Sequence, residues 1–268
     1  MILINKRELD RKKFPDGTPL LHCEPCEEAR IEWFYESDEE LFQLLCVARH
    51  LREGGTRRME LFLPYLPNAR MDRVKHRDEV FTLKYFCEWI NSLSFDAVEV
   101  TDVHSDVGRA LLNNIVPLTP KKALERVLDR VGREDLVIYF PDEGASKRYV
   151  DLLPGFATCY GRKVRDWKSG KILGLEIVKG DLDLKGAKVL MVDDICSYGG
   201  TFYYSVAALK EEGVDKICSF ATHTEASLLS EKSKYLQLLK SGEVERHFTT
   251  RSLHRDESEY IEEVSNEA

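Results

Sequence analysis

The residues best suited to chemistry lie in one short stretch, KVLMVDDICSYGGTF, at residues 188–202. An apolar run leads into Asp193 and Asp194, and a polar loop that ends in Gly199–Thr201 precedes a segment that favours a helix. Glycines let the backbone approach an anion closely, and the free N–H groups at the start of a helix attract negative charge. Carboxylates at a strand end accept hydrogen bonds from sugar hydroxyls. The stretch therefore predicts a cradle for a sugar phosphate, with a solvated strand–turn–helix as the alternative.

Candidate phosphate and metal ligands follow two apolar runs in the first half of the chain. Arg70 and Asp72 come after residues 59–66, and His104 comes after residues 97–103. The planar, permanently charged fork of an arginine suits a phosphate, and an imidazole can ligate a metal or donate to a phosphate. The alternatives are a solvated loop arginine and a structural histidine whose hydrogen bonds are satisfied.

Two further sets of residues lie in the second half of the chain. Asp142, Gly144 and Arg148 follow another apolar run, where Pro, Asp and Gly are ordinary turn residues. Lys163 and Arg165 alternate with a valine beyond a strand-like segment, so both could face one way. Two cations there would neutralise the charge of a transferred phosphate group, whereas the alternative is a solvated hairpin with alternating charge.

Strands and helices alternate along the chain, which predicts parallel sheets with helices on both faces. The expected strands are residues 59–66, 97–103, 136–140, 188–192 and 216–222, and the expected helices are residues 39–53, 80–93, 119–131, 202–212 and 228–239. A change of unit near residues 118–133 divides the chain into two α/β halves, with Thr119 as the cap of the helix there. We also expect a mobile lid over residues 166–180 and a frayed or helical tail over residues 255–268.

The composition argues against nucleic-acid binding, membrane insertion and secretion. The net charge of −8 disfavours a nucleic-acid binder, and no apolar run reaches the ~18 residues of a membrane helix. The N-terminus lacks the apolar core of a signal peptide, and seven scattered cysteines indicate a reducing cytoplasm. Cys23 and Cys26 form a CxxC without a second pair of ligands, so we interpret the pair as structurally incidental.

The stretch VLMVDDICSYGGT resembles the phosphoribosyl-diphosphate signature shared by phosphoribosyltransferases and ribose-phosphate diphosphokinases. Other segments resemble the diphosphokinase family and occur in its order: KFPDGT, LFLPYLPNARMDR, VTDVHSDV, FPDEGASKR, the triplet Lys163–Arg165 and Ala221–His223. The resemblance implies an α/β protein of two tandem type-I phosphoribosyltransferase-like domains. Residues 1–118 would form the ATP side and residues 119–268 the ribose-phosphate side. It also implies a homo-oligomer whose active sites lie between the domains and near a subunit interface.

The resemblance implies a role for each candidate residue. Lys163 and Arg165 would be the catalytic cations. ATP would be held by Phe14, Asp16, Arg70, Asp72 and His104, and Mg²⁺ by His104 and Asp142. The pyrophosphate would lie against the loop of Asp142, Gly144 and Arg148. The ribose phosphate would be held by Asp193, Asp194, Ser197, Tyr198, Gly199, Gly200 and Thr201.

The implied activity is the Mg²⁺-dependent transfer of the β,γ-pyrophosphate of ATP to the anomeric hydroxyl of ribose 5-phosphate. A phosphoribosyltransferase would share only the cradle, and a silent regulatory subunit would have lost metal and clamp residues that are present here. Thr18, Met71 and Ala145 replace three residues of the family's pattern. Tyr198 stands where the family has threonine, and stacking on its ring favours ADP-ribose as an alternative acceptor, which would serve NAD synthesis.

Overall fold

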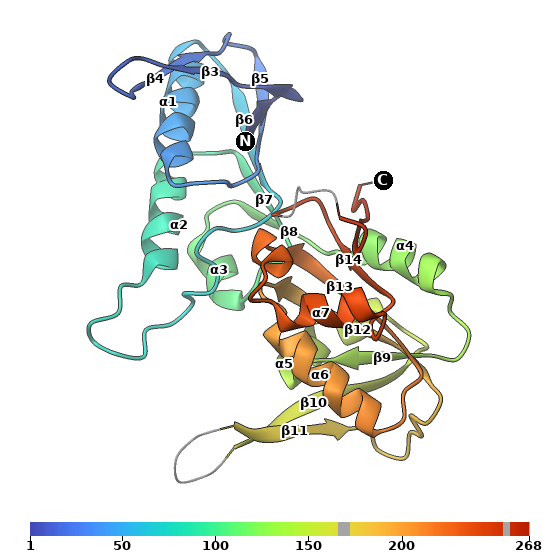
Figure 1. The fold of residues 1–268 in the computed structure, drawn as a ribbon. Coiled ribbons are helices and arrows are strands. Elements are labelled where there is room, and N and C mark those ends of the chain that lie inside the picture. The colour runs from blue at the N-terminus through green and yellow to red at the C-terminus, as the bar shows by residue number, and fades with distance from the viewer. Residues whose placement is uncertain (166–171, 254–257, 268) are drawn as a thin grey trace. The chain divides into compact units, whose positions relative to one another are not determined.

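The structure is a computed structural model that describes residues 1–165, 172–253 and 258–267 (Figure 1). The side chains of residues 163–165 and 172–174 lie outside that description. The chain divides into two compact units, Met1–Thr119 and Pro120–Ala268. Within the described ranges, no helix combines the length and the apolar character needed to cross a membrane.

A six-stranded sheet forms the centre of the first unit, in the order β2-β1-β5-β6-β7-β8. Its strands are β1 (Ile2–Ile4), β2 (Arg7–Glu8), β5 (Glu28–Trp33), β6 (Arg58–Leu63), β7 (Ala97–Thr101) and β8 (Ile115–Leu118). Strands β5 to β8 run parallel, whereas β1 is antiparallel to both of its neighbours. The strands β3 (Asp10–Lys13) and β4 (Pro19–His22) form a separate hairpin.

Three helices complete the first unit: α1 (Glu39–Glu53), α2 (Thr82–Ser92) and α3 (Asp106–Leu111). In α1, Leu44, Val47, Ala48 and Leu51 recur at the spacing of one helix face, and all four are buried. They join the apolar side chains of β5, β6 and β7 in a single core, so the helix is held by burial of that face.

A seven-stranded sheet forms the centre of the second unit, in the order β11-β10-β9-β12-β13-β14-β15. Its strands are β9 (Leu136–Phe140), β10 (Ala157–Arg165), β11 (Ile172–Val178), β12 (Lys188–Cys196), β13 (Lys216–Thr224), β14 (Arg246–Thr249) and β15 (Ile261–Glu263). Its helices are α4 (Lys121–Val131), α5 (Glu143–Tyr149), α6 (Gly200–Glu211) and α7 (Lys234–Ser241), with short 3₁₀ turns η1 (Val150–Leu152) and η2 (Ala226–Leu229). Strand β11 pairs antiparallel with β10, and the pairs from β10 through β15 are parallel.

Alternate residues of the central strands enter two separate cores. Ile138 and Leu190 pack with α4 and α5, whereas Tyr139 and Met191 pack with α6 and α7. The sheet is therefore covered on both faces (Figure 1), and every residue of β9 is buried as a result. This is the α/β architecture that the alternation of strands and helices predicts.

Several element boundaries differ from the prediction, most of them because tertiary contacts decide them. Strand β12 continues to Cys196, so Asp193 and Asp194 belong to the strand itself, and Asp193 and Ile195 on either side of Asp194 pair with β13. Helix α4 is capped by Pro120, and Thr119 lies one residue further from it. The predicted helix 228–239 is wrong, because η2 ends at Leu229 and α7 starts only after Ser233 caps it.

Two expectations about irregular segments are also wrong. Residues 172–178 of the predicted lid form β11, which buries Ile177 beside β10, while residues 166–171 lie outside the described part. The tail contains β15 at the sheet edge, because Ile261 and Val264 supply apolar side chains that become buried there.

Candidate functional site

The segment predicted to bind phosphate, residues 197–201 and here named the phosphate loop, joins β12 to α6. Gly199 caps α6 in the left-handed conformation at φ 73°, and a Cβ built on it would lie 2.5 Å from the Cβ of Tyr235. A Cβ on Gly200 would meet nothing within 4 Å, so that side of the loop is open. Thr201 is exposed, and Tyr198 is 49% exposed. The loop thus presents the start of α6 to an open space, as an anion site requires.

The acidic pair lies directly before this loop. Asp193 is half-buried and accepts a hydrogen bond of 2.9 Å from the backbone N–H of Asp194, which is itself buried. Burial, together with the neighbouring charge of Asp194, raises the pKa of Asp193 well above its usual range. The pair therefore favours a proton, a cation or hydroxyl donors from a ligand over two bare negative charges.

Arg148 reaches the acidic pair from α5. Its Nη1 lies 2.5 Å from Oδ2 of Asp194, and both side chains are largely shielded from solvent. The pairing depends on the sheet order, because β9 leads into α5 and lies beside β12 with the same direction. The carboxyl ends of the two strands consequently share one edge, where ligands of α/β proteins bind.

Asp142 begins α5 at the same edge. Its Oδ1 accepts a hydrogen bond of 3.0 Å from the N–H of Ala145, which caps the helix. A Cβ on Gly144 would lie 3.1 Å from that oxygen, so the glycine leaves room beside the carboxylate. The charge of Asp142 is one of the causes that raise the pKa of Asp193. Three carboxylates and one guanidinium thus converge in the second unit.

In the first unit, Asp72 and His104 lie close together at the carboxyl edge of β6 and β7. Asp72 is buried and bonds Arg73 at 2.7 and 3.1 Å. Its pKa is lowered mainly by that bond, with further contributions from Ser105 and from the charge of His104. The ionised carboxylate holds this loop in place, while Arg70 is exposed two residues before it.

Phe14 and Asp16 lie in the turn between β3 and β4. Oδ1 of Asp16 accepts hydrogen bonds from the N–H and the hydroxyl of Thr18, at 3.0 and 2.7 Å, and these bonds lower its pKa. The ring of Phe14 is 49% exposed. Asp16 thus shapes the hairpin, and Phe14 offers an apolar surface to solvent.

Two of the predicted sets of site residues are not brought together by the described part of the structure. The backbone of Lys163 and Arg165 belongs to β10, with a register shift between Val164 and Arg165, but both side chains lie outside the described part. His104 and Asp142, the predicted metal ligands, belong to different units. Over residues 1–165, 172–253 and 258–267, no three His, Cys, Asp or Glu side chains are placed to hold a metal by themselves.

Sequence reasoning missed the residues that support the phosphate loop from within the protein. Ser233 donates to the carbonyl of Tyr198 at 2.9 Å, and the ring of Tyr235 packs under Gly199. Ser205 donates to the carbonyl of Thr201 at 2.9 Å. A signal for Ser233 was present, because a serine before an amphipathic segment is a typical helix cap.

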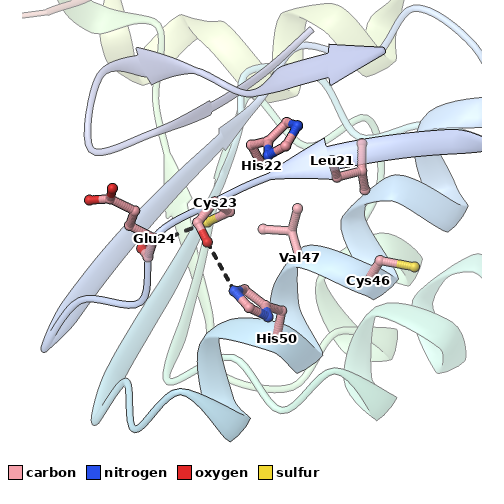
Figure 2. A pocket seen from close by; sticks show the side chains of 7 residues that line it. All are labelled: Leu21, His22, Cys23, Glu24, Cys46, Val47 and His50. Carbon is pink, nitrogen blue, oxygen red and sulfur yellow. Dashed lines mark hydrogen bonds between the residues drawn. The ribbon is translucent and has the colours of Figure 1, made fainter. Parts of the chain in front are cut away.

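A cavity of about 550 Å³ lies elsewhere in the first unit, between β4 and α1 (Figure 2). It is lined by Leu21, His22, Cys23, Glu24, Cys46, Val47 and His50. Nε2 of His50 lies 2.9 Å from the carbonyl oxygen of Cys23. Helix α1 runs back from the carboxyl end of β5 to the amino end of β6, so His50 in its last turn lies at the edge opposite Asp72.

Comparison with known proteins gives relatives that share one name. The chain is 30% identical over 223 residues to the ribose-phosphate pyrophosphokinase of Pyrococcus furiosus, covering 79% of this chain and 76% of that protein. It is 29% identical over 223 residues to the same-named protein of Thermococcus kodakarensis, covering 81% and 77%. A search against protein-family models finds no match.

A solved structure extends the likeness to the fold. The phosphoribosylpyrophosphate synthetase from Mycobacterium smegmatis superposes with a TM-score of 0.78 at 20% identity, covering 96% of this chain and 86% of that chain. This confirms the expected fold class of phosphoribosyltransferase-like α/β domains. By sequence and fold together, the chain belongs to the ribose-phosphate pyrophosphokinase family.

Proposed function

We propose that this chain transfers the β,γ-pyrophosphate of ATP to the anomeric hydroxyl of ribose 5-phosphate, giving phosphoribosyl pyrophosphate and AMP. The observation that carries the proposal is the open phosphate loop beside Asp193 and Asp194, within a chain of this family. Backbone N–H groups at the start of α6 suit a terminal phosphate, which presents three oxygens. The carboxylates suit the hydroxyls of a ribose held by that phosphate.

We assign one substrate to each unit. The second unit, Pro120–Ala268, would hold the acceptor sugar, and the first, Met1–Thr119, would hold ATP. Arg70 and His104 would contact the triphosphate of ATP, with Asp72 fixing the loop of Arg70 through its bond to Arg73. The exposed ring of Phe14, beside Asp16, would contribute to an adenine site in a homo-oligomer.

In the reaction, the anomeric oxygen attacks the β-phosphorus of ATP. The bond from that phosphorus to the α–β bridging oxygen breaks, AMP leaves with this oxygen, and the proton of the hydroxyl is released. Lys163 and Arg165 would neutralise the charge that shifts onto the bridging oxygen. Such positioning and charge neutralisation account for most of the catalysis of phosphoryl transfer.

The donor chemistry of the second unit fits Mg²⁺. Asp142, Asp193 and Asp194 gather carboxylate charge at one edge, where Arg148 pairs with Asp194, and burial together with the charge of Asp194 raises the pKa of Asp193. Mg²⁺ keeps several waters and needs only one or two carboxylates when substrate phosphates also bind it. When bound, it neutralises and orients the triphosphate. We propose Asp142 as its ligand in this unit and His104 as its ligand or phosphate donor in the first.

Tyr198 makes ADP-ribose an alternative acceptor to ribose 5-phosphate, and the two can be compared directly. Its side chain is 49% exposed beside the phosphate loop, where a ring could stack on the adenosine half of ADP-ribose. The family's name favours ribose 5-phosphate. Both acceptors undergo the same transfer, so the distinction changes the product and leaves the mechanism unchanged.

The experiment incubates the protein with ATP, Mg²⁺ and either acceptor, and identifies the products by mass. We expect AMP and a diphosphorylated ribose 5-phosphate in equal amounts. Asp193→Asn should lower this yield, and Asp215→Asn, at an exposed aspartate of the same unit, should leave it unchanged. Transfer to ADP-ribose alone would reassign the acceptor. Absence of AMP with both acceptors would refute the proposed reaction.

A further inference from the structure

One side of the phosphate loop packs against the protein, and the other side is open. Gly199 is required by its left-handed φ of 73° and by Tyr235, whose Cβ leaves no space for a side chain. Gly200, by contrast, faces open space. The conformation that opens the loop to a phosphate therefore depends on the start of α7, the element beneath it.

One buried hydroxyl joins the loop to that helix. Oγ of Ser233 donates to the carbonyl of Tyr198 at 2.9 Å and accepts from the N–H of Leu236 at 3.0 Å. The side chain is fully buried, so water does not replace either bond readily. A serine hydroxyl has a single proton, and here that proton goes to the loop while a lone pair caps α7.

The neighbouring Tyr235 ties the same helix to the sheet. Its ring stacks on Phe202 of α6 with centroids 5.4 Å apart, and its hydroxyl lies 2.6 Å from Oγ of Ser219 in β13. Ser219 in turn lies 2.7 Å from Nδ1 of His247, whose Nε2 lies 2.9 Å from Oγ1 of Thr224. These contacts hold the start of α7 against the sheet and α6, and the hydrogen bond of Ser233 connects it to the loop.

We propose that Ser233 is a positioning residue for the acceptor phosphate. By holding the carbonyl of Tyr198, it keeps the N–H groups of Gly200 and Thr201 aimed into the open space where the phosphate binds. This inference rests on the proposed function, because the loop's ligand is taken to be the phosphate of ribose 5-phosphate. Removal of the hydroxyl leaves the Tyr198 carbonyl without this bond and lets the loop leave its binding conformation.

The test compares Ser233→Ala with Ser233→Thr, which keeps the hydroxyl, and with Gln237→Gly. Gln237 is exposed in the middle of α7, so its change to glycine weakens the same helix without touching the loop. We expect Ser233→Ala to raise KM for ribose 5-phosphate about 3- to 10-fold, the worth of one hydrogen bond. KM for ATP should stay within about twofold, and Ser233→Thr should restore the wild-type value. Equal acceptor KM values for Ser233→Ala and Gln237→Gly would overturn the proposal.

A second readout needs no turnover. Hydrogen exchange of the Tyr203 amide, which donates to the carbonyl of Gly199 in the loop at 2.8 Å, should accelerate without substrate in Ser233→Ala and stay near wild type in Gln237→Gly. Should Ser233→Ala fail to fold, Ser233→Cys keeps the volume with a weaker donor and should show the same pattern. Unchanged exchange of the Tyr203 amide in these variants would refute the positioning role of Ser233. A wild-type protein without pyrophosphate transfer refutes the proposed function instead, because amide exchange is measured independently.

Discussion

Replacement of Asp193 by asparagine should stabilise the protein while impairing its use of the acceptor. Burial and the adjacent charge of Asp194 raise the pKa of Asp193 well above its ordinary value. Asparagine has nearly the same shape, carries no charge and keeps the oxygen that accepts the N–H of Asp194 at 2.9 Å. Asp193→Asn therefore removes a charge penalty without removing the local hydrogen bond.

The sign of the pH dependence follows from linkage. A carboxyl with a raised pKa binds its proton more tightly in the folded than in the unfolded chain. The stability that the bound proton contributes is therefore lost as the pH rises from the pKa of the unfolded state, about 4, through the pKa of the folded state. Each pKa unit is worth about 1.4 kcal/mol. Single substitutions that relieve an unfavourable charge commonly stabilise a protein by about 0.5–2 kcal/mol, so we expect a gain of about 1–2 kcal/mol near pH 7. That gain raises Tm by about 2–8 °C.

Calorimetry between pH 4 and pH 8, with a chelator and without substrate, measures the effect. Asp215→Asn, at an exposed position of the same unit, is the matched control and should leave Tm unchanged. The acceptor KM of Asp193→Asn should rise because one hydroxyl partner is weakened. A Tm difference that does not widen from pH 4 to pH 8 would contradict the electrostatic reasoning.

Three further outcomes test other parts of the site. Arg148→Met removes the cation 2.5 Å from Asp194 and should lower the free energy of unfolding by about 2–4 kcal/mol, read from urea midpoints. An unchanged midpoint would mean that solvent already screens the pair. Lys163→Ala and Arg165→Ala should each lower kcat on the order of 10²-fold with smaller changes in KM. Near-normal kcat in both would place them outside the catalytic site. Excess chelator should abolish turnover and added Mg²⁺ restore it; activity that persists in chelator would refute the metal requirement.

The parts of the site that depend on local sequence could be predicted. An apolar strand, two aspartates and a glycine pair are contiguous, so the loop between β12 and α6 follows from residues 188–202 alone. The family resemblance and the α/β fold class were likewise accessible, because strand–helix alternation and motif order are read directly from the chain.

Contacts between distant segments could not be predicted. The pairing of Arg148 with Asp194 requires β9 and β12 to be neighbours, which no local pattern specifies. Ser233 lay within a segment whose spaced apolar residues favoured one helix from 228 to 239, although its hydroxyl caps α7 and reaches Tyr198. The strand β15 lay in an acidic tail whose apolar side chains are buried only because β14 offers an open edge.

Phosphorus NMR of the protein with ATP, Mg²⁺ and ribose 5-phosphate tests the central claim most directly. Transfer of an intact pyrophosphate predicts a new pair of coupled diphosphate signals on the sugar, with AMP appearing in equal amount. ADP together with a singly phosphorylated product, or with free phosphate, would mean that the terminal phosphate alone moves. That result would contradict the assignment of this chain as a pyrophosphokinase.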